Sequence, residues 1–572
     1  MNSATVRTIP MSLPVRRRVF AIVLVVAVSV SVAAPQQTLT ESIEVRVANI
    51  DVVVRDKAGN PVTGLTKDDF ELFEDGKQQP ITNLYEVRRN ADVIAPQATR
   101  PDETPSAVTP AAPVEQRPRK LILFVDSFSL QPSRKAPILA AVERFIDRQM
   151  KPEDQAMLVS WRLSVSVLTP FTSDKAVVKN GIEALGRTVR GPDEVSKLKA
   201  DIQELIRIAL TGTPMMSMGE ARARSLQLVD AYAAGLELRE QDLLNDLGRM
   251  AATLAGVEGK KVLVFTGENL PEHPGAELYR YVNAQFAPYL GRNSNPLDMQ
   301  EVMGTTGNRM QQTITNVANQ AGAYGVTIYT INAADTNSDF SADNDGAPDP
   351  SESFTRYANT SAALQTIASI TGGVAIANTT NFDLAFDTIG RDLDSYYSLG
   401  YKPREKGSST RKIVVKTKNR AYRVRTPQTF ILRSTEDQMK DRTIANLYAE
   451  MPSAWPVAIR TAPPKKDGRG IYAIPVQVVM ASTLTLLPEG KDLVGGFVLY
   501  FTVGSVAGGP SEVMRRPETL RIPATAEAAV RAKPMTFTTT IRVKQGESML
   551  SVGVIDQTSA TTGFARLKLV AQ

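Results

Sequence analysis

Strand-like and helix-like patterns alternate over residues 119–403. Residues 121–125, 261–266 and 327–331 are short apolar runs, which are typical of strands that are buried on both faces. Between these runs apolar residues recur at helical spacing, for example over residues 173–186. Repeated strand-helix units of this kind favour a mostly parallel sheet. We therefore predict one α/β domain with helices on both faces of its sheet.

A helical insertion is predicted at residues 190–256 of this domain. Its apolar residues form two stripes at helical spacing, namely Val195, Leu198, Ile202 and Leu205, and Leu243, Leu247, Met250 and Leu254. Such stripes usually pack in a core. We interpret them in this way, with a groove for a partner as the alternative.

β-rich segments are expected on both sides of the α/β domain. Alternating polar and apolar residues predict a small N-terminal β-rich domain at 40–90, and frequent prolines predict an extended linker at 91–118. Strand patterns return in a β extension at 404–432. They continue at 433–572, where turns rich in glycine and proline favour a β-sandwich-like domain.

The first 33 residues have the pattern of a secretory signal peptide. Three arginines at 16–18 precede an apolar run, and small residues follow up to Ala33. We expect cleavage near Ala33, with a retained N-terminal anchor as the alternative. The protein is then exported, to the periplasm, the cell surface or the medium. No later stretch approaches about 18 consecutive apolar residues, so we expect no membrane span after cleavage.

Composition removes several classes of chemistry. The chain has no cysteine, which excludes disulfides and thiol nucleophiles, and one histidine, His273, which we interpret as a loop residue. The formal charge is +6, and residues 1–33 contribute four arginines and no acid, which leaves +2. This small excess does not indicate nucleic-acid binding.

Three stretches together resemble the bacterial family of exported proteins related to the von Willebrand factor type A domain. They are 51–85, with its Gly-Leu-Thr-Lys-Asp-Asp-Phe core, 120–130, and 371–401. The resemblance implies a Rossmann-like α/β fold. It also implies protein binding through a divalent cation, held at the carboxyl edge of the sheet by a metal-ion-dependent adhesion site.

The metal motif that the resemblance implies is incomplete here. Intact members have Asp-x-Ser-x-Ser after the first strand, a later threonine, and an aspartate after the fourth strand. Asp126 matches the first ligand, but Phe128 and Leu130 stand at the serine positions, and Gly267-Glu268 follows the fourth strand. Apolar side chains offer no oxygen to Mg²⁺. We predict a degenerate site with Asp126 as its remnant, and no dependence of ligand binding on Mg²⁺ or Mn²⁺. A shifted site using Ser127, Ser129 and Glu268 is the alternative.

An acidic loop after the strand at 327–331 has the spacing of a calcium loop. The residues at loop positions one, three, five, six, nine and twelve are Ser341, Asp343, Asp345, Gly346, Asp349 and Glu352. The alternative is an ordinary solvated loop. We predict that, if the protein binds a cation, the site is this loop, with Asp343, Asp345, Asp349 and Glu352 as ligands of Ca²⁺ or, as the alternative, Mg²⁺, and we assign no other cofactor.

These patterns favour a non-enzymatic module for protein binding or adhesion, with a protein as its ligand. The alternative is a hydrolase that uses only carboxylates. We expect no pair of carboxylates in surroundings that would shift their pKa values, and we therefore favour the binding module.

Overall fold

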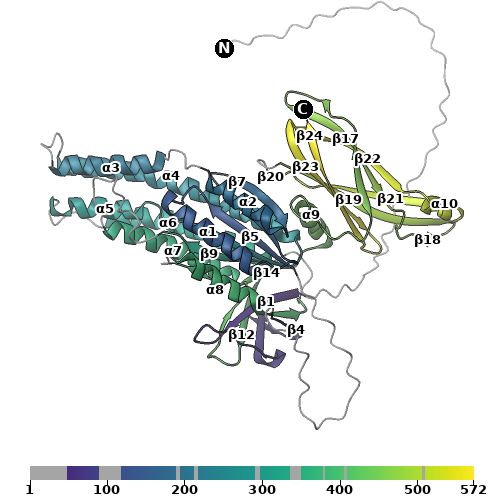
Figure 1. The fold of residues 1–572 in the computed structure, drawn as a ribbon, viewed down its shortest axis with the longest axis horizontal. Coiled ribbons are helices and arrows are strands. Elements are labelled where there is room, and N and C mark those ends of the chain that lie inside the picture. The colour runs from purple at the N-terminus through teal and green to yellow at the C-terminus, as the bar shows by residue number, and fades with distance from the viewer. Residues whose placement is uncertain are drawn as a thin grey trace, which may run out of the picture. The chain divides into compact units, whose positions relative to one another are not determined.

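A computed structural model (Figure 1) describes residues 48–88, 118–188, 194–211, 217–268, 270–289, 297–334, 350–377, 381–404, 409–505 and 509–571. The predicted signal peptide and the linker up to residue 117 lie outside these described residues. So do Asp343, Asp345 and Asp349 of the acidic loop. Glu352 falls in a helix, but its side chain is outside the described part.

The α/β part is built on a six-stranded sheet. In spatial order its strands are β10 (Ala375–Ile376), β9 (Val326–Asn332), β8 (Lys260–Gly267), β5 (Arg119–Asp126), β6 (Gln155–Trp161) and β7 (Val165–Thr172). All neighbours are parallel except β6 and β7. This is the 3-2-1-4-5-6 order of Rossmann-like folds. The predicted strands at 121–125, 261–266 and 327–331 are neighbours in this sheet, as expected.

Helices cover both faces of the sheet. Successive side chains of a strand point to opposite faces, so each strand contributes residues to two cores. Leu121, Leu123 and Val125 of β5 share a core with helices α1 (Pro132–Gln149), α2 (Lys175–Gly186) and α8 (Phe382–Asp394). Ile122 and Phe124 share the other core with α4 (Met218–Thr253), α6 (Leu297–Ala323) and α7 (Pro350–Thr371). A strand that is buried on both faces must be apolar at every position, as residues 121–125 are.

The predicted insertion is a pair of helices, α3 (Glu194–Thr211) and α4, followed by a short turn, η2 (Leu254–Gly256). The second half of α4 packs on the sheet through Leu243, Leu247 and Met250. Its first half packs in a separate core with α3 and with α5 (Ala276–Phe286), which ends in the turn η3 (Ala287–Tyr289). In Figure 1, α3 and the start of α4 extend past the sheet. The second stripe and Ile202 of the first are core residues, as predicted, whereas Leu198 and Leu205 are half-buried and the Val195 side chain lies outside the described residues.

The N-terminal strands pair with strands more than 300 residues later. One sheet is β13-β1-β11-β4 and another is β14-β12-β2-β3. Their bounds are β1 (Ala48–Arg55), β2 (Phe70–Glu74), β3 (Lys77–Gln79), β4 (Ile81–Arg88), β11 (Ser395–Tyr401), β12 (Thr410–Thr417), β13 (Arg423–Arg425) and β14 (Thr429–Ile431), with a short turn η1 (Lys67–Asp69). The segments expected separately at 40–90 and 404–432 therefore share one core, which contains Leu72, Leu399 and Ile413.

The C-terminal part begins with α9 (Thr435–Ala445) and continues as two sheets with a common core that includes Val476, Leu499 and Val552. One sheet holds β15 (Val457–Thr461), β16 (Lys465–Lys466), β17 (Ile471–Met480) and β22 (Met535–Lys544). The other holds β18 (Leu487–Glu489), β19 (Asp492–Ser505), β20 (Gly509–Pro510), β21 (Met514–Pro523), β23 (Gly546–Asp556) and β24 (Thr562–Ala571). A turn η4 (Ala524–Ala526) and a short helix α10 (Glu527–Arg531) join β21 to β22. Within the described residues, the helices include none with the length and apolar character of a membrane span.

Candidate functional site

Open α/β sheets usually bind ligands at the carboxyl edge of their strands. Here β5 ends at this edge with Asp126, which is only 1% exposed. Its Oδ1 accepts hydrogen bonds from the backbone N–H groups of Phe128 (3.1 Å) and Ser129 (3.2 Å). The carboxylate therefore stabilises the turn that follows β5.

Phe128 and Leu130, at the serine positions of the motif, make apolar contacts. Leu130 is buried in the core beneath α1. Phe128 packs edge-on against Trp161 of β6, with ring centroids 6.2 Å apart. The Trp161 Nε1–H in turn donates to Asp246 of α4 (2.9 Å). Both positions thus belong to the packing between sheet and helices.

The oxygens proposed for a shifted site contact backbone N–H groups or, for Ser127, the hydroxyl of Ser160. The N–H of Glu268 donates to Ser129 Oγ (3.0 Å), and the N–H of Gln131 donates to Glu268 Oε1 (2.9 Å). Ser127 Oγ lies 2.8 Å from Ser160 Oγ. The structure therefore brings Ser129 and Glu268 together. Their hydrogen bonds link the loop that follows β8 to the loop that follows β5.

Two charged residues of α4, Arg239 and Glu240, complete this edge. The Arg239 Nε and Nη2 groups donate to Glu240 Oε1 at 3.0 and 2.8 Å. The guanidinium carbon lies 5.0 Å from the centroid of the Phe128 ring. Both residues are buried. An arginine cation from the insertion thus lies over the ring of Phe128, two residues after Asp126.

The pKa values of the two carboxylates respond to this burial. Burial raises the pKa of Asp126, and hydrogen bonds from Ser129 and the positive charge of Arg239 oppose the rise. Burial also raises the pKa of Glu240, to about 7; Arg239 opposes this shift and the charge of Asp126 adds to it. The expectation that no pair of carboxylates has shifted pKa values was therefore wrong. It failed because Glu240 is far from Asp126 in sequence.

The sequence does contain a signal for the buried pair of Arg239 and Glu240. Leu236, Arg239, Glu240, Leu243 and Leu247 recur at helical spacing, and all five are buried. Arg239 and Glu240 therefore interrupt an apolar stripe, although charged residues are seldom fully buried unless they are paired. Charges on the apolar face of a helix indicate a buried ion pair.

His273 is held by contacts of its backbone. The N–H of His273 donates to the Asn359 side chain (2.8 Å), and Asn359 donates to the His273 carbonyl (2.7 Å), so His273 helps to fix a loop. Among the residues that the structure describes, no group of three or more histidine, aspartate or glutamate side chains is arranged to hold a metal ion.

The sequence matches no protein-family model and no curated protein. Among solved structures it is similar to an aerotolerance-related membrane protein from Bacteroides fragilis (14% identity, TM-score 0.24, covering 48% of this chain and 98% of that one). It is also similar to the von Willebrand factor domain of the type V pili tip protein Mfa5 from Porphyromonas gingivalis (15% identity, TM-score 0.21, 48% and 95%). A third is a von Willebrand factor type A structure from Catenulispora acidiphila (11% identity, TM-score 0.20, 80% and 67%). The protein has a mixed α/β fold, and von Willebrand factor type A domains are among its structural neighbours.

Proposed function

We propose that this chain is an exported, non-enzymatic protein-binding module with a von Willebrand factor type A-like domain, in which Arg239 takes the place of the divalent cation. The observation that carries the proposal is the buried Arg239–Glu240 ion pair beside Asp126. The pattern at residues 1–33 supports export.

The residues around Asp126 do not fit a hard divalent cation. Mg²⁺ requires oxygen ligands in near-octahedral geometry. Phe128 and Leu130 supply none, and Asp126 Oδ1 already accepts two backbone N–H groups. Arg239 also contributes a positive charge that lowers the pKa of Asp126, and the same charge repels a metal ion. We infer that this edge is a degenerate adhesion site.

One observation favours the hydrolase as a second candidate. Carboxylate pairs with shifted pKa values are typical of acid-base catalysis, and Asp126 and Glu240 form such a pair. Each of these residues is only 1% exposed, so a substrate has no route to their oxygens in this conformation. Burial therefore supports the binding module. A hydrolytic activity that Glu240→Gln abolishes would favour the enzyme.

The helical insertion offers a surface for a protein partner. Two of its large apolar side chains are exposed, namely Ile208 of α3 (53%) and Leu238 of α4 (66%), and Tyr289 of the turn η3 is also exposed (54%). Leu238 directly precedes Arg239, so it lies next to the closed edge. Exposed apolar residues beside a rigid core are common in protein interfaces. We propose that the partner contacts this helical surface.

A photo-crosslinking amino acid at position 238, in the cells that produce the protein, tests the proposal. We expect a discrete crosslinked product at position 238 that a metal chelator does not remove. Position 177 on α2 is the matched control, because Val177 is also an exposed helical residue (44%) but packs outside the insertion. The same product at both positions, or a product that the chelator abolishes, would contradict the proposal.

A further inference from the structure

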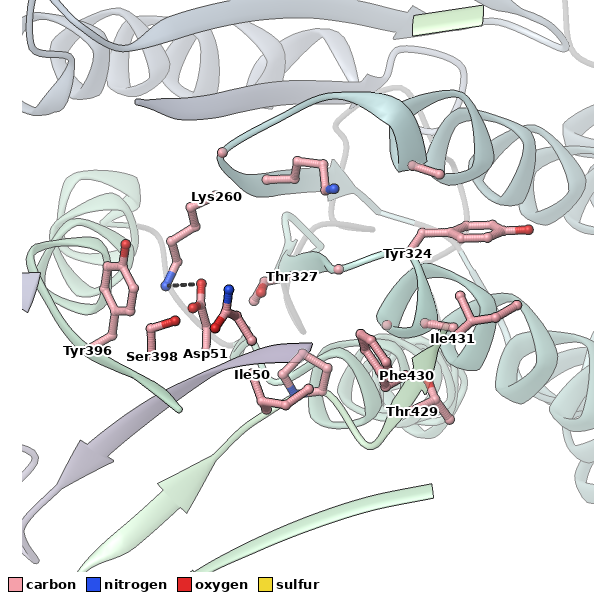
Figure 2. Close-up of a pocket in the computed structure, with 18 of the residues that line it drawn as sticks. Ile50, Asp51, Lys260, Tyr324, Thr327, Tyr396, Ser398, Thr429, Phe430 and Ile431 are labelled. Carbon is pink, nitrogen blue, oxygen red and sulfur yellow. Dashed lines mark ion pairs between the residues drawn. The ribbon is translucent and has the colours of Figure 1, made fainter. Parts of the chain in front are cut away.

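A cavity of about 450 Å³ lies at the opposite, amino edge of the sheet (Figure 2). It is lined by the start of β8, the turn between α6 and β9, the strands β1, β4 and β11, and the segment around β14. This volume falls in the range of small-molecule sites, which is roughly 300–1,000 Å³. The cavity is distinct from the edge that holds Asp126.

One wall of the cavity is a polar face of the N-terminal sheet. Asp51 of β1 is paired with Ser398 of β11, which is paired with Tyr85 of β4. Tyr396 lies two residues before Ser398 and therefore on the same face. All four residues line the cavity. The opposite face of this sheet holds the apolar core, so the alternation of the strands produces a polar wall.

Two lysines at the start of β8 enter this cavity. Lys260 Nζ lies 3.6 Å from Asp51 Oδ2 and 3.2 Å from the centroid of the Tyr396 ring. The positive charge of Lys260 is therefore neutralised by Asp51. Lys261 Nζ donates to the Val257 carbonyl (3.2 Å), and within the described residues no carboxylate lies within 4.0 Å of it. Among the residues that the structure describes, Lys261 thus has a positive charge without a direct counter-ion.

The other end of the cavity is apolar. Figure 2 shows Tyr324, Phe430 and Ile431 together, away from Lys260, Asp51 and Tyr396. The guanidinium carbon of Arg433 lies 5.3 Å from the centroid of the Tyr324 ring. Arg433 is held by Asp441 in a two-fold hydrogen bond of 2.8 and 2.6 Å. The cavity therefore combines a polar end with an aromatic end.

We propose that this cavity binds a small organic monocarboxylate, with Lys261 as the counter-ion of the carboxylate and the Tyr324–Phe430 end around the apolar body of the ligand. The charges of the lining support a single negative charge. Lys260 is paired with Asp51 and Arg433 with Asp441, which leaves Lys261 to be neutralised. A phosphate with two charges would leave one of its charges without a partner.

The electrostatics of Lys261 agree with this role. Burial lowers its pKa to about 8, although the charges of Asp441, Asp51 and Glu258 oppose the shift. The neighbouring cations Lys260 and Arg433 line the same cavity. A bound carboxylate favours the protonated amine, so binding near pH 8 takes up protons.

Calorimetry on the full chain tests the proposal, with 3-phenylpropionate as the probe and its neutral amide as the matched ligand. At pH 7 we expect the acid to bind about ten-fold more tightly than the amide, as a hydrogen bond to a charged group predicts. Lys261→Met should abolish this preference and leave the affinity for the amide unchanged, which shows that the variant is folded.

Lys175→Met is the control variant. Lys175 is also half-buried and also donates to a backbone carbonyl, that of Asp147 (2.8 Å), but lies on α2. It should keep the preference for the acid. Equal affinity for acid and amide, or a preference that survives in Lys261→Met, would overturn the proposal. So would phosphate binding as tightly as the acid, or no saturable binding of 3-phenylpropionate, benzoate or octanoate up to about 10 mM.

Discussion

The two edges of the same sheet differ in how their buried charges are neutralised. At the carboxyl edge, Arg239 of the insertion is paired with Glu240 and opposes the rise that burial causes in the pKa of Asp126, and all three residues are buried. At the amino edge, Lys261 faces a cavity and has no direct counter-ion within the described part of the chain. The strand order alone places ligands at the carboxyl edge. In the proposed function, the inserted helix brings its own cation to that edge, while the cavity described above lies at the opposite edge.

Removing the arginine cation should have the largest effect. Arg239→Met leaves Glu240 and Asp126 buried without their cation, which we expect to lower the free energy of unfolding by about 3–5 kcal/mol. Urea denaturation at pH 7 measures this. Arg249→Met on the same helix is the control, because the Arg249 side chain is 74% exposed in its ion pair with Asp246, and its loss should cost less than about 1 kcal/mol. Equal losses would contradict a buried, charge-balanced edge.

Glu240 should make stability depend on pH. Its pKa is about 7 in the folded protein and 4.5 in an unfolded chain, so the folded state binds more protons between these values. The free energy of unfolding should therefore fall as pH rises from about 4.5 to 7, by about 3 kcal/mol from this residue, and then level off. Glu240→Gln should remove this decline.

Urea denaturation at pH 5 and pH 8 checks the prediction, with Glu204→Gln on α3 as the control. The Glu204 pKa is lowered by its hydrogen bond to Arg207, so this residue should not contribute to the decline. A decline that persists unchanged in Glu240→Gln would show that other groups cause it.

Lys261→Met should change the free energy of unfolding less than Arg239→Met does, and it should raise this free energy instead of lowering it. The Lys261 pKa is about 8 when folded and 10.5 when unfolded, so the unfolded chain binds more protons between these values. Wild-type stability should therefore rise from this residue as pH rises through that range. At pH 7 the variant should be more stable by about 1–2 kcal/mol, a value reduced because the side chain is not fully buried.

Melting curves at pH 7 and pH 10 measure this difference for Lys261→Met, and it should shrink at the higher pH. Lys175→Met serves again as the control, with no such pH-dependent gain. A Lys261→Met variant that is less stable than the wild type at pH 7 would mean that the ammonium group stabilises the fold. It would contradict a charge that is neutralised only when a ligand binds.

The central sheet was predictable because strands buried on both faces must be continuously apolar, as 121–125 is. The stripes of α4 were predictable from helical spacing. The pairing of β1 with β11 was not, because strands over 300 residues apart leave no local pattern. Nor was the burial of Arg239 near Asp126, since charges on a helix are usually assumed to face solvent. The cavity at Lys261 gathers residues from several distant segments, and only the folded chain brings them together.

The acidic loop gives the next prediction. Any rise in melting temperature that Ca²⁺ produces in the wild type should be absent when Asp343 and Asp345 are replaced with Asn and Glu352 with Gln, because ligand-linked stabilisation requires the site. The triple change removes charge at nearly constant shape. Melting curves with Ca²⁺ and with a chelator decide the matter. A shift that survives the triple change would place the calcium site elsewhere.

Titration of the wild type and of Asp126→Ala with Mg²⁺ in a calorimeter tests the central claim most directly, since an edge neutralised by Arg239 has no need of a metal ion. We predict no saturable heat at Asp126 in the wild type, and therefore no Mg²⁺-dependent difference between the two proteins, although Asp126→Ala loses the hydrogen bonds to Phe128 and Ser129. Tight Mg²⁺ binding by the wild type that Asp126→Ala abolishes would contradict the account.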